Sequence, residues 1–289
     1  MPFLDADFDA RVESRQLRGC DALAFVDAFD DFDFLIVAVT EFQFARVDRD
    51  GGARLVVTDT NRKAGRRWGT TKDNDGSTEM ADEQAPPDPS DNRLDLFDRR
   101  TTDVQTVAEQ TGDVRATASG YGNPLSFTPG DRAANAVDAD PTTSWKVGAF
   151  SDVRGEWLEL RTTAAAAAHQ SLTLAQPRTG LNRFITKVRL TFDGRESVDV
   201  ALDDSSRGPT GQRIDLGGRT FRTVRITVVD TDRGVLGTYQ GVSGVGFSTA
   251  RLDDTAPTVE VIRPPVDLLD AAGEHALTAP ITLVFHRRT

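Results

Sequence analysis

The chain of 289 residues carries a formal net charge of −11, and 38% of its residues are hydrophobic. This length allows one large domain or two ordinary ones. The negative net charge argues against nucleic acid and anionic membrane surfaces as partners, because both would be repelled. Neutral ligands such as sugars are not excluded by this charge.

The first 112 residues divide by composition into two parts. We expect residues 1–68 to form a small N-terminal segment of β or α/β structure. Its β-rich runs FDFLIVAVTEFQFARV and ARLVVTDT flank Asp50-Gly51-Gly52, a sequence typical of a hairpin turn. Residues 69–112 are poor in apolar residues and include EQAPPDPSDNR, so we expect a linker or surface excursion there. The opening MPFLDADFDARVESR lacks the basic start and apolar middle of a signal peptide, and no apolar run reaches the ~20 residues of a membrane helix.

Residues 113–252 have the pattern of a mostly β domain. Short β-rich runs such as EWLELRT, KVRLTF and VRITVVD recur between turn signals, and no helical pattern lies between them. Many short strands separated by turns are typical of an antiparallel β-sandwich or jelly roll, and the missing helices argue against a parallel α/β sheet. The alternating apolar residues of two runs predict inward-facing positions: Val188, Leu190, Phe192, Val224, Ile226 and Val228.

Residues 253–289 look like a connector followed by one further strand. Prolines punctuate DDTAPTVEVIRPPVDLL, and HALTAPITLVFHRRT then begins a new β-rich run near the end of the chain. We expect this run to be the first strand of a further, truncated module.

The stretch NAVDADPTTSWKVG contains two aspartates, Asp138 and Asp140, spaced as in a metal-binding or turn motif. An EF-hand is excluded, because Thr143 stands where that loop needs glycine and Ala149 where it needs glutamate. Two interpretations stay open. The carboxylates can accept backbone N–H groups in an Asx-turn network that Pro141 bends, or they can offer hard oxygen ligands to calcium.

With GEWLEL after it, this stretch resembles the opening of discoidin-like, galactose-binding-like modules. Such modules are β-sandwich jelly rolls that usually bind glycans through loops at one end, and many hold a structural calcium ion. The resemblance implies that Asp138, Asp140 and Thr143 are calcium ligands and that Trp145 and Trp157 are core residues. Related modules often place a glutamate near the last strand, where this chain has GFST.

A longer resemblance covers residues 53–289. LVVTDTNRKAGRRWGTTKDNDGSTE, DPSDNRLDLF, YGNPLSFTPGDRAANAVDADPTTSWKVGAFSDVRGEWLEL and LDDSSRG resemble the extracytoplasmic portion of mycobacterial α-(1→3)-arabinofuranosyltransferases. That family builds branched cell-wall arabinan from a polyprenyl-phosphate arabinose donor; its catalytic part is a multi-helix membrane domain, and its soluble part carries carbohydrate-binding modules. The resemblance implies an extracytoplasmic, non-catalytic region that partners neighbouring domains of the same enzyme.

The sequence therefore leaves several functions to weigh. A module that binds an arabinan- or galactan-type glycan, as in arabinogalactan or lipoarabinomannan, is favoured over a structural spacer without its own ligand. An independent glycosidase needs two carboxylates at a defined separation, and no such pair can be chosen from so acidic a chain. Sugar recognition combines an aromatic face with directional hydrogen bonds. The residues of these types in predicted loops are Tyr121, Asn123, Arg154, Asn182, Arg183 and Tyr239.

Overall fold

The computed structural model of the chain contains two compact units. It describes residues 34–35, 54–58, 65–67, 75–78, 105–122, 128–233, 242–253, 255–277 and 280–284. The larger unit comprises Lys63–Asn92, Gln105–Pro264 and Arg287–Thr289, and the smaller comprises Met1–Arg62, Arg93–Val104 and Pro265–His286.

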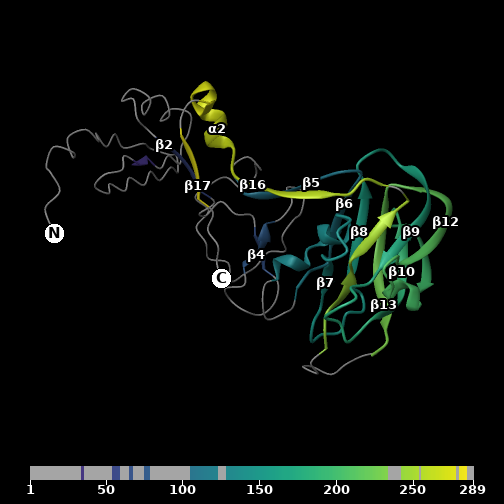
Figure 1. Cartoon of the computed structure of the whole chain (residues 1–289). Coiled ribbons are helices and arrows are strands. Elements are labelled where there is room, and N and C mark those ends of the chain that lie inside the picture. The colour runs from purple at the N-terminus through teal and green to yellow at the C-terminus, as the bar shows by residue number, and fades with distance from the viewer. Residues whose placement is uncertain are drawn as a thin grey trace, which may run out of the picture. The chain divides into compact units, whose positions relative to one another are not determined.

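The larger unit is built around a β-sandwich, and the predicted mostly β, antiparallel fold of residues 113–252 is confirmed (Figure 1). One sheet has the strand order β11-β10-β13-β8-β6 and the other has the order β12-β9-β15, while β14 pairs with β7; every pair is antiparallel. The strands are β6 (Val114–Ala118), β7 (Trp145–Val147), β8 (Trp157–Thr162), β9 (Ala167–Ala175), β10 (Ile185–Phe192), β11 (Glu196–Ala201), β12 (Gln212–Phe221), β13 (Thr223–Thr231), β14 (Val245–Phe247) and β15 (Thr249–Leu252). Short 3-10 helices lie between them: η3 (Pro129–Asp131), η4 (Ala133–Ala136) and η5 (Asp204–Arg207).

The core lies between the two sheets, and the predicted alternation fills it. The six inward-facing residues predicted from β10 and β13 are all buried, and they join one apolar cluster with residues of β8, β9, β12 and β15. Each buried aliphatic side chain contributes about 1.5–3 kcal/mol, so this cluster is the main source of the unit's stability.

Trp145 is a central residue of this core. Its side chain is fully buried, its Nε1 donates to the Gly120 carbonyl at 2.8 Å, and its ring stacks on Phe247 with centroids 6.1 Å apart. A Cβ on Gly246 would lie 1.8 Å from the Trp145 carbonyl oxygen, so β14 can pair with β7 here only through a glycine.

The second expected core tryptophan, Trp157, lies elsewhere, and that prediction is wrong. Trp157 is half-buried on the outer face of β8, whereas its neighbour Leu158 is fully buried on the inner face. The Arg225 guanidinium covers its ring at 4.1 Å from the centroid. Because successive side chains of a strand point to opposite faces, only one of these two neighbours can enter the core.

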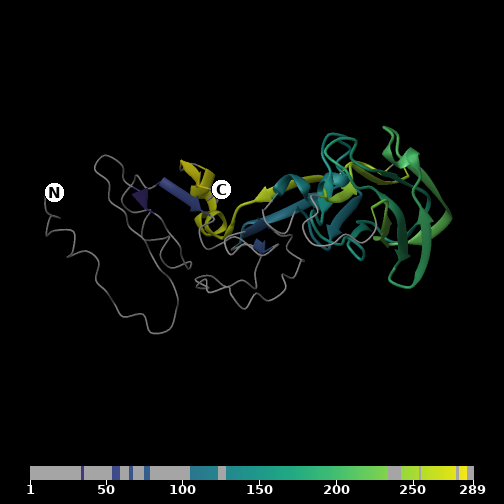
Figure 2. The ribbon, with the colours of Figure 1, turned by 90° about the horizontal axis from the view of Figure 1, so that it is seen from below.

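A two-stranded ribbon extends the β structure of the sandwich beyond the predicted limits of residues 113–252. β5 (Val107–Thr111) comes from the expected linker, and β16 (Val259–Arg263) comes from the expected connector, yet the two pair antiparallel over their whole length. The ribbon extends from one side of the sandwich (Figures 1 and 2). The Gln110 side chain ties it to β6, since its amide exchanges two hydrogen bonds with the backbone of Ala116, at 2.8 and 3.0 Å.

The larger unit also holds the short pair β3 (Gly65–Arg67) and β4 (Asp75–Thr78). The smaller unit contains β1 (Phe34–Leu35), β2 (Arg54–Thr58), α2 (Asp267–Ala272), η6 (Gly273–Leu277) and β17 (Ile281–Val284).

In the smaller unit, β1 pairs parallel with β2, which differs from the expected antiparallel hairpin; the Asp50-Gly51-Gly52 turn lies outside the described residues. β17 also pairs parallel with β2, so the strand predicted within residues 253–289 joins this sheet. No helix in the described part of the chain is long and apolar enough to cross a membrane.

Candidate functional site

The loops at one end of the sandwich form the candidate site. β8 and β10 begin at this end and β13 finishes there, because Ile185 pairs with Thr231 and Trp157 with Thr227 in antiparallel register. β14 begins there too. We call the described loop residues 148–156, 177–184, 232–233 and 242–244, together with the neighbouring turn 202–211, the loop end.

Arg183 holds the loop end together from inside. Its side chain is 1% exposed, and its guanidinium donates to the carbonyls of Ser151 at 2.7 Å, Gly148 at 2.8 Å and Ser243 at 2.8 Å. Burial lowers the pKa of Arg183, while Asp152 and Asp232 act in the opposite direction. Both Nη atoms of Arg183 thus donate to backbone carbonyls of two other loops, so the structure gives this residue a role in holding the loops together, and its predicted contact with a glycan stays a prediction.

Arg154 lies on the exposed side of the same loop and is paired with Asp152. Its Nε donates to both carboxylate oxygens at 3.1 Å and one Nη donates at 2.7 Å. The hydrogen bonds from Arg154 lower the pKa of Asp152, and Asp152 raises the pKa of Arg154, so both groups stay charged over the neutral range. The second Nη atom of Arg154 carries two further N–H donors, so the pair offers a fixed, exposed set of donors and acceptors.

Asn182 joins two of the loops through its backbone and its side chain. Its backbone N–H donates to the Ser243 hydroxyl at 3.0 Å, and its side-chain carbonyl accepts the Ser243 N–H at 2.8 Å. Its backbone carbonyl accepts from Arg233. The side-chain carbonyl and the backbone of Asn182 therefore serve the fold.

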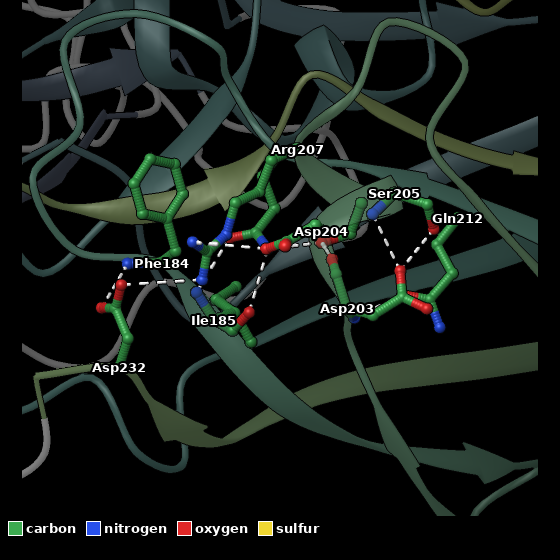
Figure 3. Close-up of polar contacts among 10 residues, drawn as sticks. Phe184, Ile185, Asp203, Asp204, Ser205, Arg207, Gln212 and Asp232 are labelled. Carbon is green, nitrogen blue, oxygen red and sulfur yellow. Dashed lines mark hydrogen bonds and ion pairs between the residues drawn. The ribbon is translucent and has the colours of Figure 1, made fainter.

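The Phe184 ring also lies in the loop end, and it was not among the residues predicted from the sequence. The Arg207 guanidinium lies over the Phe184 ring at 4.4 Å and within 3.6 Å of Asp232, whose carboxylate also accepts the Phe184 N–H at 2.9 Å (Figure 3). Asp203 caps η5 by accepting the Ser205 N–H at 2.8 Å, which positions Arg207. The LDDSSRG stretch carried the signal, because an aspartate two residues before a serine is typical of a capped turn.

The structure thus brings together three of the six predicted glycan-binding residues, Arg154, Asn182 and Arg183, two of them with exposed groups. Tyr121 is half-buried and packs against the core. The next residue, Gly122, contacts the start of the 148–156 loop, because its carbonyl accepts the Gly148 N–H at 3.2 Å. Asn123 and Tyr239 lie outside the described residues.

The Asp138–Thr143 loop forms a separate oxygen-rich cluster. Asp138 and Asp140 each accept the backbone N–H two residues ahead, at 2.9 and 2.8 Å, so the predicted Asx-turn network is present. The Thr143 hydroxyl lies 2.7 Å from an Asp138 carboxylate oxygen, 2.9 Å from the Asp140 carbonyl and 3.3 Å from the Asn135 carbonyl. One hydroxyl proton can serve only one of these three acceptors, so the cluster has more oxygens than donors.

This donor set suits a hard cation better than a transition metal. Carboxylate, hydroxyl and backbone carbonyl oxygens are the ligands that calcium prefers. No group of three or more histidine, cysteine, aspartate or glutamate side chains converges in the described part of the chain, so the loop offers two carboxylates and several neutral oxygens. Hydrogen bonds from Thr142 lower the pKa of Asp140, which keeps this carboxylate ionised.

No family model matches the chain, and no curated protein matches it. Among solved structures, the arabinofuranosyltransferase AftD from Mycobacteria is similar over 78% of this chain, with 20% sequence identity and a TM-score of 0.49. The match covers 17% of the AftD chain, so this chain spans less than a fifth of that protein. The family 32 carbohydrate-binding module of NanJ from C. perfringens, in complex with galactose, matches 50% of this chain over 98% of its own length, with 16% identity and a TM-score of 0.36. A chitosan-binding module from Paenibacillus sp. IK-5 matches 48% of the chain over 92% of its own, with 18% identity and a TM-score of 0.32. The chain is thus similar to part of an arabinofuranosyltransferase and to carbohydrate-binding modules, the two kinds of protein that its sequence motifs resemble.

Proposed function

We propose that the loop end is a glycan-binding site and that the chain is a non-catalytic module region of a cell-wall arabinofuranosyltransferase. The observation that carries the proposal is the geometry around Arg183, because this buried guanidinium of the 177–184 loop fixes two other loops. The outer side of these three loops presents the Asp152–Arg154 pair and the exposed residue Asn182. Fixed polar groups reduce the entropy that a shallow site loses on binding. The sandwich fold and the motifs around Trp145 support the same assignment.

The ligand we propose is a neutral arabinan- or galactan-type chain. The charges of the loop end balance, because its described residues include five carboxylates and five arginines: Asp152, Glu156, Asp203, Asp204, Asp232, Arg154, Arg178, Arg183, Arg207 and Arg233. Among them, Asp152 pairs with Arg154 and Asp232 with Arg207. Paired charges still donate and accept hydrogen bonds, which is what sugar hydroxyls require. In this proposal the region acts outside the cytoplasm in arabinan assembly, beside neighbouring domains of the same enzyme, and transfers no arabinose itself.

Binding can be tested by NMR titration of the chain with arabinan and galactan oligosaccharides. We expect weak binding, with shifts at Asp152, Arg154 and Asn182, that Arg154→Gln weakens. Arg213→Gln is the matched control, because Arg213 is an exposed arginine of β12 in the other sheet. Unshifted spectra with both glycans would refute the proposal and favour the spacer. Turnover of a polyprenyl donor or a glycoside by this chain would refute its non-catalytic part.

We also propose that Asp138, Asp140 and Thr143 hold a structural calcium ion. The support is the surplus of oxygen acceptors around the Thr143 hydroxyl. Bound calcium would cross-link the loop that precedes Trp145. The loop turns without a metal, since its Asx hydrogen bonds are already formed, so calcium would add stability and not chemistry.

Calcium binding can be tested by melting the chain in calcium and in chelator. We expect the melting temperature to rise with calcium, because the ion binds only the folded loop. Asp138→Asn should abolish the rise, since the amide oxygen can still accept the Asp140 N–H while the charge is lost. Asp215→Asn is the matched control, because Asp215 also accepts a backbone N–H two residues ahead, at 2.8 Å. Equal melting in calcium and chelator would refute the site.

A further inference from the structure

Arg207 lies in the loop end with N–H groups that make no hydrogen bond to the described residues. Its guanidinium covers the Phe184 ring at 4.4 Å from the centroid (Figure 3). Nη2 lies 3.6 Å from an Asp232 carboxylate oxygen, and Nη1 lies 3.8 Å from an Asp204 carboxylate oxygen. A hydrogen bond between a guanidinium and a carboxylate is about 2.7–2.9 Å long, so a gap separates Arg207 from each carboxylate.

Stacking on an aromatic ring does not by itself create such gaps, as two other arginines of the sandwich show. Arg219 lies over the Phe192 ring at 4.6 Å and donates directly to a Glu196 carboxylate oxygen at 3.0 Å. Arg225, which also covers an aromatic ring, donates to a glutamate at 3.0 Å. Of the stacked arginines in the described part of the chain, only Arg207 therefore lacks a direct bond to a carboxylate.

The two sides of the Arg207 stack are fastened to one buried amide, that of Gln176. This side chain is fully buried, and its Nε2 donates to the Ile185 carbonyl and to the Ser206 hydroxyl, each at 2.9 Å. Its Oε1 accepts the Ile185 N–H at 2.8 Å. Because Ile185 follows Phe184 and Ser206 precedes Arg207, the ring and the turn that carries the guanidinium are fixed relative to each other before any ligand binds, which lowers the entropy lost on binding.

Each gap suits a group that accepts from an N–H and donates to a carboxylate. A hydroxyl does both with one oxygen atom, and water takes this place in the free protein. The side chains of Arg207 and Asp232 are 34% and 32% exposed, so a ligand can reach the gap between them. An anion at this place would be repelled by Asp204 and Asp232, and a cation by Arg207. The chemistry therefore favours a neutral hydroxyl compound.

The two gaps lie side by side, because they belong to the two Nη atoms of one planar guanidinium. This group presents its N–H bonds as a rigid fork. Nη1 is on the Asp204 side of the fork and Nη2 on the Asp232 side. Two hydroxyls on adjacent carbons of a sugar ring can each accept from one Nη and donate to the carboxylate beside it. Hydroxyls on distant carbons cannot meet both Nη atoms, and a substituent on either oxygen removes the proton that the carboxylate accepts.

We propose that Arg207, Asp204 and Asp232 form a specificity subsite of the loop end, which binds two unsubstituted hydroxyls on adjacent carbons of one sugar residue. The inference rests on the proposed glycan-binding function and adds the feature of the glycan that is recognised. A sugar residue fits the subsite only while neither hydroxyl carries a branch. The region therefore holds unbranched stretches of a glycan in preference to residues that are substituted at one of these hydroxyls.

The test is NMR titration of the whole chain with an arabinan and a galactan oligosaccharide that carry adjacent free hydroxyls. Each is compared with its own derivative in which one hydroxyl of every adjacent pair is methylated. We expect an unmodified oligosaccharide to shift the amide signals of Phe184, Arg207 and Asp232 together with those of Asp152 and Arg154. The methylated derivative should bind about fivefold more weakly or worse, because a hydrogen bond to a charged group is lost, and should leave the first three signals in place.

Arg207→Lys separates the fork from the charge, since lysine keeps the positive charge and has no second Nη. We expect this variant to bind the unmodified oligosaccharide about tenfold more weakly and to lose the preference for it over the methylated derivative. Arg219→Lys is the matched control, because it changes an arginine stacked on Phe192, the last residue of β10, whereas the loop end lies at the first. This control should bind like the wild type. If Arg207→Lys melts at a lower temperature, the methylated derivatives still decide the question on the wild-type chain.

Several results would overturn the subsite. Methylated derivatives that bind as well as the unmodified oligosaccharides show that no pair of hydroxyls is recognised. A preference that survives in Arg207→Lys shows that another residue recognises the pair. Shifts at Asp152 and Arg154 without shifts at Arg207 and Asp232 leave glycan binding at the loop end intact and remove the subsite alone. Absence of binding to both unmodified oligosaccharides removes the proposed function and the subsite together, so the two failures are distinguishable.

Discussion

Replacing Arg183 with methionine is the sharpest test of how the loop end is built. Methionine has a similar length and fills similar space, but it removes every donor, so the carbonyls of Gly148, Ser151 and Ser243 lose this partner together. The Gly148 carbonyl keeps the Ser151 hydroxyl as a donor, at 3.0 Å. A buried acceptor left without a donor costs about 1–3 kcal/mol. The contacts to Ser151 and Ser243 are only partly buried, so water can replace them, and removing the buried cation recovers part of its desolvation cost. We therefore expect a net loss of about 1–3 kcal/mol.

Urea unfolding and native-state amide exchange measure this loss. The exchange rates should rise first in the 148–156 and 242–244 loops, because these lose their anchor while the sheets do not. Arg183→Lys should lie between wild type and Arg183→Met, since one ammonium group can reach fewer carbonyls at once. Arg178→Met is the matched control, an exposed arginine of the same loop, and should unfold like the wild type. A change below about 0.5 kcal/mol in Arg183→Met would refute the reasoning; unchanged stability with lost glycan binding would restore a ligand role.

Three further groups, Trp145, Asp253 and Asp199, test the core and the ion pairs of the sandwich. Trp145→Ala should cost about 3–5 kcal/mol in urea unfolding, because it empties the centre of the core, and a cost below about 1 kcal/mol would contradict its central position. Burial raises the pKa of Asp253, but backbone hydrogen bonds from Ser171 and Gln170 and the contact with His169 outweigh burial and leave the pKa lowered. The ionised carboxylate should therefore stabilise the fold above the usual aspartate pKa of about 3.9, and this stabilisation should be lost as pH falls through the lowered pKa. The difference in unfolding free energy between the wild type and Asp253→Asn should shrink on acidification. The hydrogen bonds from Arg189 and Lys187 lower the pKa of Asp199 to about 2, and NMR titration should show this value rising in Arg189→Gln; an unchanged pKa would exclude the ion pair in solution.

The sandwich was predictable because its signal is local. Period-two alternation in β10 and β13 placed Val188, Leu190 and Val224 on the inner face, and the structure buries all three. The strands β5 and β16 lie in segments that were predicted to be a linker and a connector from their polar or proline-rich composition. Their pairing joins residues 150 positions apart, such as Gln110 and Glu260. Local composition carries no information on a contact of that separation.

The site was predictable in residue type but not in role. Arg154 and Arg183 look alike in sequence, since both stand in polar loops, yet one is exposed and the other is buried beneath three carbonyls. Which arginine turns inward depends on the loop geometry that it helps to create.

The β5–β16 ribbon has a consequence for how this module relates to the chain around it. Val107 and Arg263 are cross-strand partners, so the polypeptide enters and leaves the sandwich at neighbouring points, with Cα atoms about 5 Å apart. A domain whose two ends meet can be inserted into or deleted from a host protein without stretching the host. A two- or three-residue glycine-serine bridge between Val107 and Arg263 should therefore remove the sandwich as one cassette, and the same junction offers a place where a different sugar-binding domain could be exchanged for it.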